Sequence, residues 1–367
     1  MRQFSLISSA VALTIFSGCF GGEKDCDCEE KQPQNIEKET KTVEKSSEPL
    51  MEKAKANGLK ALPETEKEVL ALVENPNNKF NDAKIELGKK LYFEPRISKS
   101  NLISCNTCHN LATGGVDGVA AAIGHGWTAN PHHLNSPTVY NAVFADRQFW
   151  DGRDPDLEKQ AQGPILAGPE MASTVEIVVD TIKSMPEYVA EFESAFGSSE
   201  VTYEKATAAI GAFERTLVTR TRLDDYLNGD ATALTGEEKK GLETFIDKGC
   251  VSCHNGYALG GSMQPFPAIG KFKYADLGDF AGDTNGMVKT PTLRNILETA
   301  PYFHNGATFD ISETVKIMAE TQLGTELSGD EVSSIVAFFG ALEGEKMEVT
   351  YPILPASTAT TPKPDVK

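Results

Sequence analysis

The sequence is short of positive charge. Its 367 residues include 35 Lys and Arg against 53 Asp and Glu, which gives a formal net charge of −18 at pH 7. A surface of this sign repels phosphate groups, so nucleic acid is not an expected partner. The same charge favours solubility or the docking of a basic protein.

The N-terminal apolar stretch lacks the length of a membrane span. It covers residues 4–16, follows Arg2 and ends at Ser17-Gly18-Cys19, so residues 1–19 are predicted to be a secretory signal. Small residues directly before a cysteine are typical of a bacterial lipobox, in which the cysteine is lipidated and becomes the mature N-terminus. Phe16 is less usual at its position, and simple cleavage is the alternative. We expect a periplasmic protein with a lipid anchor at Cys19 that holds it to a membrane.

Large apolar residues are nearly absent from residues 20–60, which are rich in Glu, Lys, Gln and Ser. Such a segment cannot bury enough surface to offset the entropy of ordering, so a flexible tether is predicted. Cys26 and Cys28 lie within it, too close for an easy disulfide and without histidine neighbours for a metal site, and we expect no catalytic role for them. Residues 352–367, with four prolines and several threonines, are predicted to be an unstructured tail.

The remaining chain is predicted to be mainly α-helical. Apolar residues recur at helical spacing within residues 69–73, 85–91 and 206–213. Thr235 with Glu238, and Ser328 with Glu331, have the spacing of capping boxes at helix starts. Residues 111–171 and 255–308 are long segments rich in Gly, Pro and Asn, more irregular chain than a helical bundle usually contains. A large cofactor would order them.

An approximate internal repeat divides the chain. Leu87-Gly88 and Leu91-Tyr92 precede one cysteine pair, and Gly241-Leu242 and Phe245 precede another. Two related modules are therefore predicted, at residues 61–223 and 224–351.

Both modules contain the pattern for covalent haem attachment. The two motifs are Cys105-Asn106-Thr107-Cys108-His109 and Cys250-Val251-Ser252-Cys253-His254. In this pattern the two thiols bond the haem vinyl groups and the histidine becomes the proximal iron ligand. Zinc and disulfides are the alternatives, but no further Cys or His pairs complete tetrahedral sites. We predict two covalent haem c groups in two domains similar to c-type cytochromes.

The motifs and the words around them resemble the bacterial di-haem cytochrome c peroxidase family over nearly all of residues 62–345. The matching stretches are residues 87–96, 123–126, 135–138, 149–153, 160–164, 169–171, 289–295 and 299–306. The resemblance implies an unequal pair of haems. The C-terminal haem would have His254 as proximal ligand and Met318 as second ligand, which raises its potential and suits it to take up electrons. Without the resemblance, Met318 would be read as a core residue of a helix.

The resemblance makes the N-terminal haem, with proximal ligand His109, the site of peroxide cleavage. His125 would be its displaceable second ligand, on a loop flanked by Gly124 and Gly126 that suits a moving ligand. A surface loop histidine is the alternative. His132 and His133, in an apparent short insertion, receive no role.

The resemblance also implies roles for residues near the haems. Glu170 would move the proton during peroxide cleavage, Gln160 would orient peroxide or water, and Trp150 would lie between the haems on the electron path. From the residues alone, Glu170 would be a solvated loop residue and Trp150 a core residue.

A calcium ion between the domains is a further implication of the resemblance. The side-chain oxygen of Asn135 and backbone carbonyls of Thr299 and Pro301 would hold it, and such oxygen ligands suit this cation. His304 would hydrogen-bond a haem propionate.

We therefore predict a cytochrome-c peroxidase that reduces hydrogen peroxide to water with electrons from a small c-type cytochrome or copper protein, and that works as a homodimer. One alternative is a MauG-like enzyme that oxidises protein side chains, but that branch has tyrosine where Met318 stands here. The other is a di-haem electron-transfer protein without peroxidase activity, against which the presence of Gln160 and Glu170 argues.

Overall fold

The computed structural model describes residues 48–345 and 347–366. The predicted signal at residues 1–19, including Cys19, lies outside the described residues, as do Cys26 and Cys28. The contacts group the described residues into one unit. No helix in the described ranges is both long enough and apolar enough to cross a membrane.

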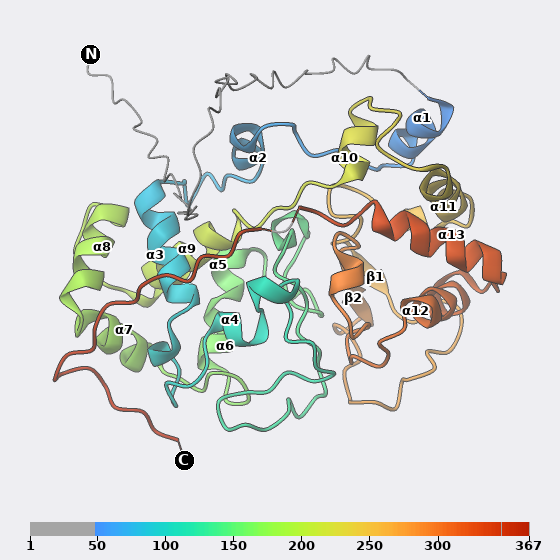
Figure 1. The fold of residues 1–367 in the computed structure, drawn as a ribbon. Coiled ribbons are helices and arrows are strands. Elements are labelled where there is room, and N and C mark those ends of the chain that lie inside the picture. The colour runs from blue at the N-terminus through green and yellow to red at the C-terminus, as the bar shows by residue number, and fades with distance from the viewer. Residues whose placement is uncertain (1–47, 346, 367) are drawn as a thin grey trace, which may run out of the picture. The chain divides into compact units, whose positions relative to one another are not determined.

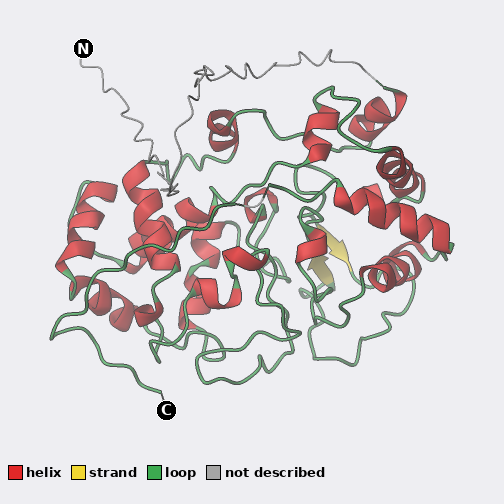
Figure 2. Cartoon of the chain, viewed as in Figure 1, coloured by secondary structure: helices red, strands yellow, loops and turns green. Residues whose placement is uncertain are grey.

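Helices dominate the regular structure, which confirms the predicted mainly α fold class (Figures 1 and 2). The first half contains α1 (Pro49–Ala56), α2 (Glu66–Leu72), α3 (Asp82–Tyr92), α4 (Cys105–Cys108), α5 (Leu157–Gln160), α6 (Gln162–Leu166), α7 (Val175–Lys183), α8 (Pro186–Phe196) and α9 (Tyr203–Glu214). The second half contains α10 (Arg222–Leu227), α11 (Gly236–Asp247), α12 (Ile311–Met318) and α13 (Gly329–Gly340). Short 3-10 turns connect several of them, namely η1 (Pro95–Ile97), η2 (Leu111–Thr113), η3 (Ala142–Phe144), η4 (Cys250–Ser252) and η5 (Ile296–Glu298), and a π-turn, η6 (Ala319–Leu323), follows α12.

Both predicted capping boxes are present. The Thr235 hydroxyl accepts a hydrogen bond from the Glu238 N–H at the start of α11, and the Ser328 hydroxyl accepts one from the Glu331 N–H at the start of α13. These reciprocal bonds satisfy N–H groups that have no partner within the helix.

The two halves share one type of helix crossing, as expected of an internal repeat. Gly88 of α3 lies so close to α9 that a Cβ atom there would sit 1.9 Å from the carbonyl oxygen of Ala209. Gly241 of α11 has the same relation to α13, where a Cβ atom would sit 1.9 Å from the carbonyl oxygen of Ser334. Only glycine allows two backbones to approach this closely. Each repeated glycine therefore marks the point where the two main helices of a module cross.

Buried apolar residues form two clusters. The first extends from Leu87 to Leu217, and the second joins residues 51–59 to the stretch from Leu223 to Leu342. The chain passes from one cluster to the other between Leu217 and Leu223, next to the boundary predicted at residue 223.

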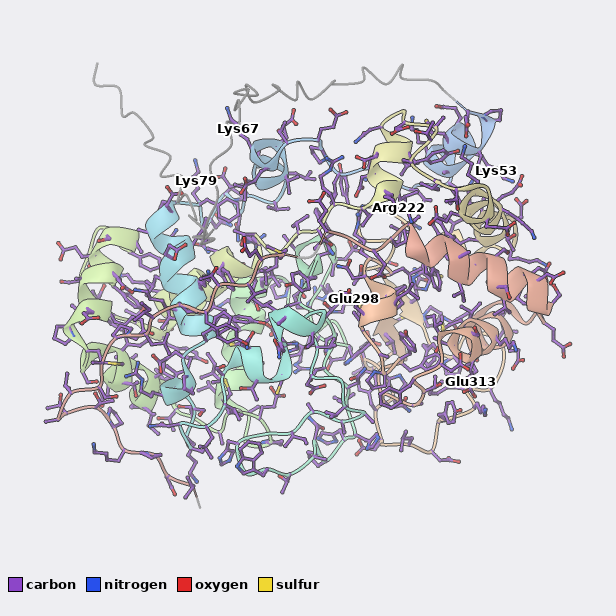
Figure 3. All side chains as sticks on the ribbon, in the orientation of Figure 1. Lys53, Lys67, Lys79, Arg222, Glu298 and Glu313 are labelled. Atoms are coloured by element: carbon purple, nitrogen blue, oxygen red, sulfur yellow. The ribbon has the colours of Figure 1, made fainter. Side chains whose placement is uncertain are left out.

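The predicted tether ends too late in the sequence, because its last residues form α1. Met51 and Ala54 of this helix are 1% and 0% exposed and belong to the second cluster. Lys53 adds an ion pair of 2.6 Å with Asp247 at the end of α11 (Figure 3). The composition concealed this helix, since the surface that buries its few apolar side chains comes from α10 and α11, far along the chain.

The predicted tail has no helix or strand in its described residues, but it is not free. Arg96 donates a hydrogen bond to the carbonyl oxygen of Pro355 at 2.8 Å, and the Thr358 hydroxyl donates one to the carbonyl oxygen of Ser184 at 2.8 Å. The red end of the chain in Figure 1 accordingly runs back over the N-terminal half. The prediction of an unstructured tail is therefore right for its secondary structure and wrong for its packing.

The two long segments are largely irregular, but the first contains the short helices α5 and α6 and the second contains a small sheet, and neither was predicted. Strands β1 (Met263–Pro265) and β2 (Met287–Lys289) pair antiparallel, with Met263 opposite Lys289. Strands of three residues are too short to show an alternating pattern in the sequence. The backbone N–H of Lys289 also donates to the carbonyl oxygen of Trp150 at 2.8 Å, which joins the sheet to the N-terminal half.

A buried ion pair secures the junction of the two halves. Arg294 and Asp224 are both 0% exposed, and the guanidinium donates to each carboxylate oxygen at 2.7 Å. Asp224 also accepts a hydrogen bond from the Leu62 N–H at 2.8 Å, and Arg294 donates one to the carbonyl oxygen of Thr219 at 3.3 Å. The pair thereby fixes the loop at residues 289–295, which contributes to the site described next.

Candidate active site

The C-terminal attachment motif follows α11 directly and presents a fixed imidazole. His254 is buried, and its Nδ1 lies 3.0 Å from the carbonyl oxygen of Leu259. Because a carbonyl can only accept, Nδ1 carries the proton and Nε2 keeps a free lone pair. Burial lowers the pKa of His254 to about 4, so the ring is neutral, the form that binds a metal.

One large cavity brings together the residues predicted for the C-terminal haem. Its lining includes Cys250, Cys253, His254 and Met318, and most of the remaining lining is apolar. Met318 is the last residue of α12, directly before the π-turn η6, a feature often found at functional sites. The predicted thioether ligand and the predicted imidazole ligand therefore face one apolar space.

The N-terminal attachment motif is built in the same way. Cys105 and Cys108 are the two ends of α4, and the next residue, His109, has its Nδ1 2.9 Å from the carbonyl oxygen of Pro137. Burial lowers the pKa of His109 as well. The Tyr92 hydroxyl donates to the carbonyl oxygen of His109 at 2.6 Å and fixes the backbone behind the ring.

All four motif cysteines are free thiols in the described structure. Burial raises the pKa of Cys250 to about 11. Burial, followed by the charges of Asp117 and Glu170, raises the pKa of Cys108 to about 12. Cys250 and Cys108 therefore keep their thiol protons at neutral pH.

The loop that carries His125 packs against the segment that carries Glu170. The N–H of His125 donates to the carbonyl oxygen of Glu170 at 2.8 Å. A Cβ atom on Gly124 would sit 1.8 Å from the carbonyl oxygen of Pro169, so glycine is required here for close approach of two backbones. Gly126, by contrast, has open space around it. The buried Nδ1 of His125 has no hydrogen-bond partner in the described chain.

Glu170 has the environment of an acid–base group. Its carboxyl is half-buried, and burial raises its pKa, whereas the charge of Arg153 acts in the opposite direction. A carboxyl with a raised pKa holds its proton to higher pH than an exposed carboxyl does, as an acid–base group requires. Gln160 lies at the end of α5 and is also half-buried, but its side chain makes no hydrogen bond to Glu170 or to any other described residue.

Trp150 lines the C-terminal cavity and is tied to the N-terminal half. It is buried, and its Nε1 donates to the carbonyl oxygen of Asn135 at 2.9 Å. Asn135 is two residues before Pro137, whose carbonyl accepts from the His109 ring. A short bonded path therefore links Trp150 to the N-terminal imidazole.

The residues predicted for calcium lie together. Asn135 Nδ2 donates to the carbonyl oxygens of Pro301 at 2.8 Å and Phe303 at 3.3 Å, and Thr299 lines the same cavity. The buried Oδ1 of Asn135 has no partner in the described chain.

His304 lies in an aromatic environment. Its ring centroid is 5.2 Å from that of Phe280, 5.6 Å from that of Phe272 and 6.4 Å from that of Trp150. Burial lowers its pKa to about 4, so the ring is neutral.

Comparison with known proteins identifies the family. A family model described as di-haem cytochrome c peroxidase matches residues 82–232. Cytochrome c551 peroxidase of Pseudomonas aeruginosa is 48% identical over 292 residues, which cover 76% of this chain and 84% of that protein. Cytochrome c551 peroxidase of Nitrosomonas europaea is 47% identical over 288 residues, with 76% and 85% covered. This chain belongs to the di-haem cytochrome c peroxidase family.

Relatives with a different name also match. Methylamine utilization protein MauG of Methylorubrum extorquens is 34% identical over 297 residues, which cover 76% of this peroxidase-family chain and 83% of that protein. Among solved structures, a MauG-like protein associated with microbial copper homeostasis aligns with a TM-score of 0.65 at 24% identity, over 74% of this chain and 93% of that one. That likeness shows that the fold is shared.

Membership of the di-haem peroxidase family implies haem c, and the residues present fit it. Each half offers two free thiols beside one neutral imidazole whose Nε2 lone pair is available. The C-terminal half adds a thioether in the same cavity, and the N-terminal half adds a buried imidazole nitrogen without a partner. This donor set is that of covalent haem with nitrogen or sulfur axial ligands.

Three buried residues near these sites were missed by the sequence reasoning. Arg294 and Lys289 lie in residues 289–295, a short stretch that matches the family sequence, but nothing in their spacing indicated burial. Glu214 is 5% exposed, and burial raises its pKa to about 8. Glu214 is the last residue of α9. The apolar residues that precede it in this helix were the only sequence signal that its position faces the core.

Proposed function

We propose that this protein is a cytochrome-c peroxidase that reduces hydrogen peroxide to water with electrons from a small c-type cytochrome or copper protein. The observation that carries the proposal is the contact between the His125 loop and the backbone of Glu170, beside the N-terminal attachment motif. This contact supports the assignment of a displaceable imidazole and an acid–base carboxyl to the N-terminal haem site. When bound, haem c supplies the redox chemistry, namely storage of an electron and reduction of the peroxide bond.

The protein's own residues supply binding, access and proton movement. Two electrons and two protons convert one peroxide into two waters, and a proton must pass from one peroxide oxygen to the other as the O–O bond breaks. Glu170 accepts this proton and returns it, and Gln160 orients peroxide or water. The Glu170 backbone holds the His125 loop through a hydrogen bond. Displacement of His125 therefore opens the site next to the segment that carries the acid–base group.

The second haem site is built for electron uptake. Met318 and His254 line one cavity, and a thioether ligand raises the potential of a haem. Trp150 lies on the wall of this cavity and, through Asn135, approaches the N-terminal imidazole. The presence of Met318 in the cavity favours the peroxidase over a MauG-like enzyme, the branch with tyrosine at this position.

Calcium, dimerisation and export complete the proposal. Asn135 contacts the carbonyl of Pro301 through its Nδ2, and its buried Oδ1 has no partner in the described chain; both observations support calcium binding by Asn135, Thr299 and Pro301. The family resemblance supports a homodimer, and the net charge of −18 favours a basic donor surface. The sequence of residues 1–19 supports export to the periplasm and a lipid anchor at Cys19.

Peroxide turnover on the oxidised and the half-reduced holoprotein, together with a haem count, tests the proposal. We expect two haems per chain and turnover in the half-reduced form. A half-reduced protein with both haems and no turnover would instead identify a di-haem electron-transfer protein. Turnover already in the oxidised form would keep the peroxidase and remove the need for activation by reduction.

A further inference from the structure

Lys289 is a buried cation that has no partner in the described structure. It is 8% exposed, and its ammonium group forms no ion pair or hydrogen bond with any described residue. Asp151, the acidic residue whose charge acts on it, forms an ion pair of 2.9 Å with Arg153 instead. An uncompensated charge in the interior is strongly unfavourable, so such a group implies an anion that the polypeptide does not supply.

The side chain cannot easily leave this position, because its backbone is held on both sides. The Lys289 N–H donates to the carbonyl oxygen of Trp150 at 2.8 Å, and the residue pairs with Met263 in the sheet. The next residue, Thr290, donates to the carbonyl oxygen of Ser262 at 2.8 Å. These contacts fix the point from which the ammonium group extends.

The cavity that Lys289 lines identifies the class of anion. The same cavity is lined by Cys250, Cys253, His254 and Met318, the residues that hold the C-terminal haem. Among the residues that line it, Lys289 is the only Lys, Arg, Asp or Glu. The one ionised side chain of an otherwise neutral cavity therefore faces a cofactor whose only anionic groups are its two propionate carboxylates.

We propose that the ammonium group of Lys289 binds a carboxylate of the C-terminal haem and, by its positive charge, helps to hold that haem at high potential. The inference rests on the proposed function in so far as it concerns the haem that takes up electrons. Lys289 is a positioning residue, since it acts on the iron through the carboxylate and through its field.

Two further observations agree with this role. Burial lowers the pKa of Lys289 to about 8, so the group is still mostly protonated at pH 7 even before an anion binds. Its charge also contributes to the lowered pKa of His109, so its field extends to the N-terminal site. A cation in this place favours an additional electron in the region between the two haems.

Substitution of Lys289 in the holoprotein tests the proposal. The Lys289→Met variant removes the charge and keeps the length of the side chain, and Lys289→Arg keeps the charge. Lys316→Met is the matched control, because Lys316 is exposed on α12, close to Met318 in sequence. The readout is the midpoint potential of the C-terminal haem, measured by spectroelectrochemistry from mildly acidic to mildly alkaline pH.

We expect Lys289→Met to lower the equilibrium constant for reduction on the order of tenfold, the scale of a unit charge acting across roughly 10 Å at an effective dielectric constant near 20. A tenfold change corresponds to about 59 mV for one electron. The potential should also depend more strongly on pH, because an unpaired carboxylate takes up a proton on reduction. Lys289→Arg should stay near the parent, and Lys316→Met should change little. Equal potentials in Lys289→Met and Lys316→Met would overturn the proposal.

A second measurement covers the case in which Lys289→Met fails to retain haem. Redox-induced infrared difference spectra of the parent and of Lys289→Arg, with isotope-labelled propionates, report the carboxylates directly. A shift of the propionate bands in Lys289→Arg supports the contact, and identical bands refute it. These results are independent of peroxide turnover. A parent protein without peroxide turnover would refute the proposed function but not this inference. An active parent whose variants keep the same haem potentials would refute this inference but not the proposed function.

Discussion

Replacing Gly124 by alanine should open the N-terminal haem site in the fully oxidised protein. The new Cβ atom would sit 1.8 Å from the carbonyl oxygen of Pro169 and 3.0 Å from that of Glu170. Both are backbone atoms, so the clash can be relieved only by separating the His125 loop from the segment that carries Glu170. This separation breaks the hydrogen bond of 2.8 Å from the His125 N–H to the Glu170 carbonyl, whether the loop or the Glu170 segment moves.

The size of the effect follows from these two contacts. Overpacking at a tight site costs about 1–3 kcal/mol, and loss of one backbone hydrogen bond costs about 0.5–1.5 kcal/mol. Together they destabilise the closed loop by roughly 1.5–4.5 kcal/mol, which shifts the equilibrium between closed and open loop by roughly 10-fold to 1,600-fold.

Electronic and electron paramagnetic resonance spectra of the oxidised holoprotein provide the assay. Gly124→Ala should show a high-spin N-terminal haem, and it should turn over peroxide without prior reduction unless the clash displaces Glu170 instead of the loop. Gly126→Ala is the matched control, because a Cβ atom there would meet nothing closer than Thr128 Oγ1 at 3.9 Å. A Gly124→Ala protein that stays low-spin, like Gly126→Ala, would refute the role of this contact in holding His125.

Four other predictions can be checked on the same protein. Glu170→Gln should lower peroxide turnover about 10²-fold to 10⁴-fold with both haems retained, whereas the exposed Glu187→Gln should not, and parental turnover in Glu170→Gln with chemistry rate-limiting would remove Glu170 from the mechanism. Burial raises the pKa of Glu170, so its carboxylate form is lost as pH falls through that raised pKa. Peroxide turnover by the parent should therefore decline with falling pH. The same decline should be absent from the pH profile of Glu170→Gln. Asp224→Asn should lower the free energy of unfolding by about 3–5 kcal/mol in denaturant titrations, because it leaves the buried Arg294 without its counter-ion, and a loss below about 1 kcal/mol would contradict this. The denatured protein should carry the mass of two haems after acid extraction, and a mass matching one haem would show that one motif is not used.

Local sequence patterns predicted the structure correctly where it depends on residues close together in the chain. The capping boxes at Thr235 and Ser328 formed as predicted, because their bonds join residues three apart. Gly88 and Gly241 could be recognised as repeated, but not as crossing points, since the residues they contact, Ala209 and Ser334, come more than 90 residues later in the chain.

Features that depend on distant partners could not be predicted. The burial of Met51 depends on α10 and α11, and the path of the tail depends on Arg96 and Ser184. Lys289 illustrates the same limit within the site, because a lysine in a short strand reads as a surface residue until the cavity around it is known. Gly124 was interpreted as a hinge, and the structure adds a steric reason for glycine that no single-sequence pattern contains.

The two haem sites differ in their predicted second ligands and not in their attachment motifs. Both proximal imidazoles are fixed in the same way, by Nδ1 bonded to a backbone carbonyl, so they do not distinguish the sites. The predicted second ligands differ in the elements that present them. Met318 ends a helix that packs against α13 and cannot move without disturbing the second core. His125 lies in a loop held at the Glu170 segment by one backbone hydrogen bond and one close backbone contact. We propose that one module holds a haem that stays closed and the other a haem that opens, because His125, unlike Met318, lies on an element that needs little free energy to move.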